Sequence, residues 1–270
     1  MRFMQKQQPK IIFFDIDDTL YIKDERRIAE STRNALQMLK EQGIITAIAT
    51  GRGPSVLPEA IKQLMAETGM ELLVSINGQF VRYRGEALAT FPLASSDIAE
   101  TGKQMAALGI AYACVTEHEV YVSYETEALV SALSRLGVAY RIGLPEANEP
   151  VYQMLAFYPQ SQDNVVETVL PASLKTVRWH EQGVDFLAAD GSKARGIQAA
   201  LDKLGLTMQD AMAFGDGLND REMMQAVGFG VVMDNGHPEL KALADYICPA
   251  VTEDGIYRGL QALGVIETAS

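Results

Sequence analysis

The chain has 270 residues, of which 48% are hydrophobic and 21% are charged, and its formal net charge is −12 at neutral pH. This composition is that of an ordinary globular protein, and the length suffices for one large domain or two smaller ones. The acidic balance argues against a general nucleic-acid or membrane-surface binder, because such proteins present a basic face to their ligand.

The N-terminal segment and the cysteines give no indication of a secreted or membrane protein. Met1–Lys6 lacks the apolar core of a signal peptide, and no apolar run reaches the length of a membrane span. Cys114 and Cys248 lie far apart in apolar surroundings, which favours buried free thiols over a disulfide or a metal site. We therefore expect a cytoplasmic protein.

The first predicted element is a buried strand at Ile11–Phe14, a short run of apolar residues. It leads into Asp15-Ile16-Asp17-Asp18-Thr19, where three carboxylates share four consecutive positions. Such carboxylates repel one another unless a cation or a phosphoryl reaction needs them together. Because open α/β sheets bind ligands at the carboxyl ends of their strands, this stretch is the first candidate site.

Strand and helix patterns then alternate along the chain. The apolar spacing predicts helices over 30–40 and 55–67 and buried strands over 44–49 and 71–76. This alternation is typical of a parallel, doubly wound sheet. The two strands end in polar turns, Thr50-Gly51-Arg52 and Asn77-Gly78.

From about residue 84 to residue 187 the pattern changes to short alternating strands. A hairpin is predicted over 110–124, further strands over 151–158, 174–180 and 184–189, and helices near Ser96, Thr126 and Ser161. One-sided strands interleaved with helices indicate an antiparallel sheet with helices on one face. We expect an inserted α+β cap domain at 84–187, within a core formed by 1–83 and 188–270.

The buried α/β pattern resumes at Ser192, with a helix predicted from there to Leu204. Strands are predicted over 211–214, 229–232 and 246–247, with a helix after each of the first two. The first of these strands runs into Gly215-Asp216-Gly217-Leu218-Asn219-Asp220.

Each polar cluster admits a chemical and a purely structural interpretation. Asp15 and Asp17 are two positions apart and point to the same side of an extended chain, so one can attack phosphorus while the other moves a proton. The alternative is a helix N-cap cluster. Thr50 and Gly51 offer a hydroxyl and an open N–H, which together can clamp a phosphate oxygen, or they form a plain turn. Arg52 could contact an anionic substrate or be solvated, and of these we favour the solvated side chain over a direct catalytic group.

The late clusters are equally ambiguous when each is taken alone. Lys193 opposes the dipole of its predicted helix, which suggests that it neutralises a bound phosphoryl group, although an exposed lysine is the alternative. Asp216 and Asp220 are oxygen ligands of the kind that Mg²⁺ takes, or they belong to a glycine-rich turn with an Asx cap.

Taken in this order, the four clusters resemble those of the haloacid dehalogenase superfamily, and the long insertion resembles its Cof-type, subfamily IIB phosphatases. The resemblance implies a Rossmann-like α/β core, with Asp15 as nucleophile and magnesium ligand. It implies Asp17 as general acid/base and as a ligand through its backbone carbonyl. Asp216 would complete the metal site, and Asp220 would be a further partner of the metal.

The same resemblance implies how the phosphoryl oxygens are held: by the backbone N–H of Ile16, by Thr50 with Gly51, by Lys193 and by Asn219. One departure is Met233-Asp234-Asn235-Gly236, where relatives usually have glycine before the asparagine. The extra charge of Asp234 puts the local loop shape in doubt.

These residues together predict a magnesium-dependent phosphatase that hydrolyses small phosphorylated metabolites, such as sugar phosphates or phosphorylated cofactors, through an aspartyl-phosphate. In-line displacement needs a nucleophile, charge screening and donors for the equatorial oxygens, and the clusters offer all three. A phosphomutase and a non-catalytic phosphometabolite-binding protein are the alternatives. Nucleic acid and membrane are not expected partners, and the metabolite and the oligomeric state are left open.

Overall fold

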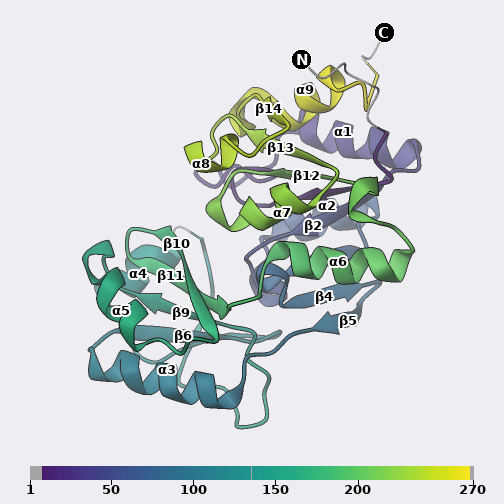
Figure 1. The fold of residues 1–270 in the computed structure, drawn as a ribbon. Helices are drawn as coiled ribbons and strands as arrows, with labels where there is room; N and C mark the ends of the chain where they lie inside the picture. Colours follow the sequence, from purple (N-terminus) through teal and green to yellow (C-terminus); the bar gives the residue numbers. More distant parts are fainter. Residues whose placement is uncertain (1–7, 135, 268–270) are drawn as a thin grey trace.

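The computed structural model describes residues 8–134 and 136–267 (Figure 1), so Met1–Lys6 lies outside the described residues. The strands of the core sheet are Ile11–Phe14 (β1), Ile45–Ala49 (β2), Leu72–Ser75 (β3), Phe80–Tyr83 (β4), Glu86–Thr90 (β5), Ala211–Gly215 (β12), Phe229–Met233 (β13) and Tyr246–Cys248 (β14). The helices packed on it are Glu30–Glu41 (α1), Glu59–Thr68 (α2), Lys193–Leu204 (α6), Arg221–Ala226 (α7), Pro238–Lys241 (α8) and Gly255–Ala262 (α9).

The core sheet has the order β14-β13-β12-β1-β2-β3-β4-β5. The neighbours from β14 to β3 pair in parallel, and β4 and β5 add antiparallel at one edge. The predicted doubly wound parallel sheet is confirmed. Its centre is β1, so the carboxyl ends of β12 and β2 flank the acidic loop that follows β1.

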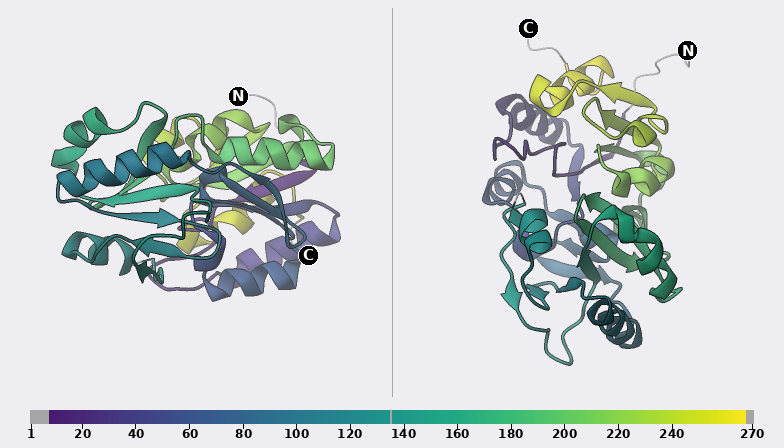
Figure 2. Two further views of the ribbon diagram at one scale, coloured as in Figure 1. Left: turned by 90° about the horizontal axis from the view of Figure 1, so that it is seen from below. Right: turned by 90° about the vertical axis from the view of Figure 1, so that its left-hand side faces the viewer.

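The alternation of side chains along β1 explains why both faces of the sheet are covered. Ile12 and Phe14 pack with α1, α2 and α9, whereas Ile11 and Phe13 pack with α6, α7 and α8. Figure 2 shows the purple α1 and the green α6 on opposite sides of the sheet. All four residues are fully buried, and each contributes about 1.5–3 kcal/mol of hydrophobic stabilisation. The loop after β1 therefore starts from a rigid strand.

The insertion contains a second sheet. Its strands are Ala111–Val115 (β6), Val120–Val122 (β7), Arg141–Ile142 (β8), Gln153–Phe157 (β9), Leu174–His180 (β10) and Gly183–Ala188 (β11), and its helices are Ser95–Ala107 (α3), Glu127–Ser134 (α4) and Asp163–Val169 (α5). The strand order is β10-β11-β9-β6-β7-β8, antiparallel except for the pair β7 and β8.

The helices of the insertion do not all cover one face of its sheet. Met105 of α3 and Val166 of α5 join one apolar cluster, as predicted. Leu129 of α4 joins the cluster on the opposite face, which also contains Ile76 and Phe80 of the core. The expectation of helices on one face is therefore wrong for α4. That second face is the one that packs against the core.

Several predicted boundaries differ from the structure. Strands β4 and β5 and helix α9 were not predicted. The helix expected from Ser55 begins at Glu59, because Pro54–Val56 forms a separate 3-10 turn and Pro58 precedes the first helical turn. The domain division at residue 84 stays a prediction, although β5, which it assigns to the insertion, pairs with β4 of the core sheet.

Two predictions made from composition can be compared with the described part of the chain. No helix in residues 8–134 or 136–267 is long and apolar enough to cross a bilayer. Cys114 and Cys248 are both buried and free, as predicted.

Candidate active site

The acidic loop folds back over the end of β1. The backbone N–H of Asp15 donates to the carbonyl of Phe214 in β12 (3.0 Å), so its position is fixed by the sheet. The carbonyl of Ile16 accepts from the N–H groups of the residues at positions 19, 20 and 21. Asp18 adopts a left-handed conformation (φ 59°). The cluster does not cap a helix, because α1 begins at Glu30, well beyond the loop.

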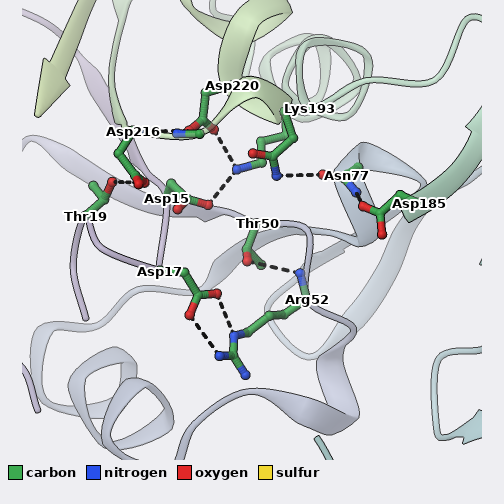
Figure 3. A network of polar contacts seen from close by, with 12 residues as sticks. Asp15, Asp17, Thr19, Thr50, Arg52, Asn77, Asp185, Lys193, Asp216 and Asp220 are labelled. Carbon is green, nitrogen blue, oxygen red and sulfur yellow. Dashed lines mark hydrogen bonds and ion pairs between the residues drawn. The ribbon is translucent and has the colours of Figure 1, made fainter. Parts of the chain in front are cut away.

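Lys193 is the cation that faces this loop. Its Nζ is fully buried and lies 2.5 Å from Oδ1 of Asp15 and 2.6 Å from Oδ1 of Asp220 (Figure 3). Burial alone lowers the pKa of Lys193, but the two carboxylates outweigh it and raise the pKa above its usual value. Ser192 caps the helix by accepting from the N–H of Arg195. The alternative of an exposed lysine is wrong.

The carboxylates around Lys193 carry more negative charge than one ammonium balances. Burial raises the pKa of Asp15 to about 7; the charges of Asp220 and Asp17 add to the rise, and Lys193 opposes it. Burial also raises the pKa of Asp216 well above its usual value, and the charge of Asp15 adds to that rise. Asp15, Asp216 and Asp220 each offer an oxygen within 4.8 Å of the others. This donor set fits a hard divalent cation.

Asp220 holds its own loop together. Its Oδ2 accepts from the backbone N–H groups of Asp216 and Gly217, both at 3.0 Å, and its Oδ1 accepts from Lys193. Both oxygens of this fully buried carboxylate are therefore engaged within the protein. Asp220 therefore closes the glycine-rich turn by accepting from N–H groups that precede it, and its side chain does not cap α7. Asp216 is held separately by Thr19, whose hydroxyl donates to Oδ1 at 3.0 Å.

The interpretation of Arg52 as a solvated side chain is wrong. Arg52 is 8% exposed, and its Nε and Nη2 donate to the two oxygens of Asp17 at 2.7 and 2.8 Å (Figure 3). Its Nη1 donates to the carbonyls of Val56 and, in the insertion, Leu136. Arg52 therefore fixes the orientation of the Asp17 carboxylate and links it to the insertion.

The predicted phosphate clamp lies beside two amide side chains. The Oγ1 of Thr50 accepts from the backbone N–H of Arg52 at 3.1 Å, so the side chain is held within its own turn. A Cβ added at Gly51 would lie 3.1 Å from Oδ1 of Asn77 and 3.3 Å from Nδ2 of Asn219. These amides therefore pack directly over the backbone at Gly51.

The Asn77-Gly78 turn requires its glycine. Gly78 has a φ of +84°, and a Cβ at this position would lie 2.0 Å from the carbonyl oxygen of Ser192. The turn therefore abuts the start of α6, one residue before Lys193. Asn77 itself adopts the left-handed conformation (φ 50°), which asparagine tolerates better than most residues.

Asn77 connects the core to the insertion. Its Nδ2 donates to Oδ2 of Asp185 at 2.9 Å (Figure 3). The same nitrogen donates to Oε1 of Gln153 at 2.9 Å, and Oδ1 of Asn77 accepts from Nδ2 of Asn219 at 3.0 Å. Gln153 and Asp185 were not predicted as site residues. The available signal was a carboxylate at the centre of the otherwise apolar strand Gly183–Ala188.

The departure at Asp234 does not bring a charge into the site. Its Oδ1 pairs with Nζ of Lys241 at 2.9 Å, and its side chain is 63% exposed. The neighbouring Asn235 supports the acidic loop, because its Nδ2 donates to the carbonyl of Asp18 at 2.9 Å and its Oδ1 accepts from the N–H of Val251.

The arrangement of these clusters agrees with comparisons to known proteins. A model of the haloacid dehalogenase-like hydrolases matches residues 12–260. The chain belongs to this family. The protein YkrA of Bacillus subtilis (strain 168) is 35% identical over 268 residues, which cover 96% of this chain and 99% of YkrA.

Two further proteins to which the chain is similar are named as phosphatases. One is the 5-amino-6-(5-phospho-D-ribitylamino)uracil phosphatase YitU of Bacillus subtilis (strain 168), 27% identical over 275 residues, or 94% of this chain and 97% of YitU. The other is the structure of the subclass IIB sugar phosphatase BT4131, 27% identical with a TM-score of 0.87, covering 95% of this chain and 99% of BT4131. The expected superfamily, subfamily IIB and phosphatase class are confirmed.

Proposed function

We propose that the chain is a magnesium-dependent phosphatase that hydrolyses small phosphorylated metabolites through an aspartyl-phosphate on Asp15. The observation that carries this proposal is the buried Asp15 carboxylate, held against the buried Lys193 ammonium at the end of the central strand. A buried carboxylate beside a fixed cation suits a nucleophile that must meet an anionic phosphoryl group. The alternative interpretations of the acidic loop and of Lys193 do not account for this contact.

The residues that would hold Mg²⁺ are Asp15, Asp216 and the backbone carbonyl of Asp17, with Asp220 beside them. The clustered carboxylate oxygens support this assignment, because Mg²⁺ takes few carboxylates and completes its coordination with water. When bound, the ion screens the repulsion between the Asp15 carboxylate and the phosphoryl oxygens. Asp220 supports Asp216 and Lys193 through its own hydrogen bonds.

In the first step the Asp15 carboxylate forms a bond to phosphorus, and the bond to the leaving-group oxygen breaks. Asp17 gives a proton to that oxygen; in the second step it takes a proton from the water that hydrolyses the aspartyl-phosphate. The oxygens of the transferred phosphoryl group would accept hydrogen bonds from five groups. These are the backbone N–H of Ile16, the hydroxyl of Thr50, the backbone N–H of Gly51, the ammonium of Lys193 and the side-chain amide of Asn219. Arg52 orients Asp17 throughout.

The relatives support small metabolites as the substrate class, because BT4131 is a sugar phosphatase and YitU acts on a phosphorylated ribitylamino-pyrimidine. A phosphomutase would return the phosphoryl group to its substrate, whereas a phosphatase releases inorganic phosphate to water. A binding protein has no need for both Asp15 and Asp17, which disfavours that alternative.

The test is phosphate release from an aryl phosphate with Mg²⁺, compared between the wild type and Asp15→Asn. We expect the variant to lose about a thousandfold or more in kcat. Chelation by EDTA should abolish the wild-type activity, and added Mg²⁺ should restore it. Asp97→Asn removes a carboxylate of the insertion that contacts Ser173, and it should keep the wild-type rate. Near wild-type turnover by Asp15→Asn refutes the covalent route.

A further inference from the structure

The insertion presents two buried polar side chains to the core. Val184 and Phe186 of β11 point into the cluster with α3 and α5, so Asp185 between them points to the opposite, core-facing side. The same alternation places Gln153 on that side, because its neighbour Met154 joins the same cluster. Asp185 is 7% exposed and Gln153 3% exposed.

Both side chains accept hydrogen bonds from one core residue, Asn77. The two contacts are 2.9 Å long, and they use both N–H groups of the Asn77 amide. Its oxygen is then left to accept from Nδ2 of Asn219. A continuous series of hydrogen bonds therefore runs from the insertion sheet to the loop that follows β12.

The direction of this series is set at its Asp185 end. An ionised carboxylate only accepts hydrogen bonds, whereas an asparagine or glutamine amide can present either its oxygen or its nitrogen. Because Asp185 only accepts, Asn77 must turn its nitrogen towards the insertion and its oxygen towards Asn219. Asn219 must in turn direct its nitrogen towards Asn77.

The glycines around Asn219 show where its amide then points. A Cβ at Gly51 would lie 3.3 Å from Nδ2 of Asn219, whereas a Cβ at Gly217 would lie 2.7 Å from its Oδ1. The nitrogen is therefore the end of the Asn219 amide that lies beside Gly51 of the predicted phosphate clamp, and the oxygen lies beside Gly217. One N–H of Nδ2 is used by Asn77, which leaves the other to donate to a phosphoryl oxygen.

We propose that Asp185 is a positioning residue for phosphoryl transfer: acting through Asn77, it fixes the orientation of the Asn219 amide so that its N–H faces the transferred phosphoryl group. This inference rests on the proposed function. It gives the insertion a part in the transfer step itself, in addition to any contact with the leaving group. Reversal of the series would point the Asn219 oxygen at an anion, which is repulsive.

A double-mutant cycle tests this indirect action. The variants are Asp185→Leu, Asn219→Ala and their combination, measured with an aryl phosphate and Mg²⁺ at pH 8, above the value of about 7 to which burial raises the pKa of Asp185. We expect each single variant to lower kcat by about ten- to a hundredfold, as supporting residues do elsewhere. We expect the double variant to be no slower than Asn219→Ala, since Asp185 acts only through Asn219.

The proposal is overturned if Asp185→Leu lowers kcat by the same factor in the Asn219→Ala background as in the wild type. It is also overturned if Asp185→Leu alone has the wild-type kcat. If Asp185→Leu fails to fold, Asp185→Asn replaces it in the cycle, because the amide has the same shape but no longer dictates the direction. We expect Asp185→Asn to lower kcat less than Asp185→Leu does, and to have no effect on kcat in the Asn219→Ala background. An effect that persists in that background overturns the proposal.

A matched control separates positioning from general docking of the insertion. Glu117 of the insertion accepts from Nη2 of Arg82 of the core at 2.6 Å, and Glu117→Gln weakens that contact. Glu117→Gln should keep the wild-type kcat, and a loss as large as that of Asp185→Leu overturns the proposal.

Binding of inorganic phosphate, measured by calorimetry with Mg²⁺, distinguishes failure of this inference from failure of the proposed function. The same non-additive pattern is expected in the phosphate affinity, whether or not the chain turns over an aryl phosphate. Additive losses of affinity overturn the role of Asp185, whereas an active Asp15→Asn variant refutes the covalent route alone.

Discussion

Replacing Lys193 by methionine tests the charge balance around which the site is built. The Lys193 ammonium is fully buried and lies 2.5 Å from the carboxylate of Asp15 and 2.6 Å from that of Asp220. Lys193→Met therefore leaves both carboxylates buried without a cation. Removing one partner of a buried ion pair costs about 3–5 kcal/mol. With about 2.1 cal/mol/K of unfolding entropy per residue, this lowers the Tm of a chain of this length by roughly 5–10 °C.

The assay is thermal unfolding followed by circular dichroism in the presence of EDTA. Lys193→Met/Asp220→Asn should regain about half of the lost free energy of unfolding, because one orphaned charge is removed with the cation. Lys175→Met is the matched control, since it breaks a half-exposed pair with Glu222 and should cost less than about 1 kcal/mol. A Tm of Lys193→Met equal to that of the wild type refutes the reasoning.

The penalty of Lys193→Met should also depend on pH. Burial raises the pKa of Asp15 to about 7 even beside Lys193, and without the ammonium it rises further. A carboxyl with a higher pKa in the folded state binds more protons there than in the unfolded state, so stability falls as the pH rises through this window. The Tm difference from the wild type should therefore be smaller at pH 5 than at pH 8. A difference that grows towards pH 5 contradicts this sign.

Three further predictions follow from contacts in the site. Arg52→Met and Arg52→Lys should both lower kcat by about tenfold or more in steady-state assays, because lysine cannot restore the two-point contact with Asp17; full activity of the lysine variant contradicts this. Gly78→Ala should lower the free energy of unfolding in urea by more than about 2 kcal/mol, because the methyl group meets the Ser192 carbonyl; an unchanged midpoint argues against that packing. Mg²⁺ should raise the Tm more at pH 8 than at pH 5, because the raised pKa values of Asp15 and Asp216 make protons compete with the ion; an equal rise at both pH values counts against this metal site.

The site residues that could be predicted from the sequence are mainly those that directly follow the ends of strands. Asp15 and Asp216 follow neighbouring parallel strands, so their proximity can be inferred once the strands are recognised. Lys193 was also suggested by its unfavourable place in the first turn of a helix. The structure brings all three together in one cluster of charges.

The residues that were missed depend on contacts across the fold. A long side chain such as Arg52 can extend into solvent or turn inwards, and only the position of Asp17 and of the Leu136 carbonyl decides between them. Asp185 is conspicuous as a carboxylate in an apolar strand. The core residue that it contacts is set by how the insertion packs on the core, which no local pattern encodes. Helix α9 was missed because glycine at positions 255 and 259 weakens its helical pattern.

The strand order also has a consequence for how this protein is made. The central strand β1 is synthesised first, yet one of its two neighbours, β12, follows only after the whole insertion. Thr19 and Asp216, which meet in the site, are 197 positions apart in the chain. Non-local pairings of this kind slow folding and expose apolar surface meanwhile. A nascent chain that ends before β12 thus leaves one edge of β1 unpaired, and an unpaired strand edge is a template for aggregation.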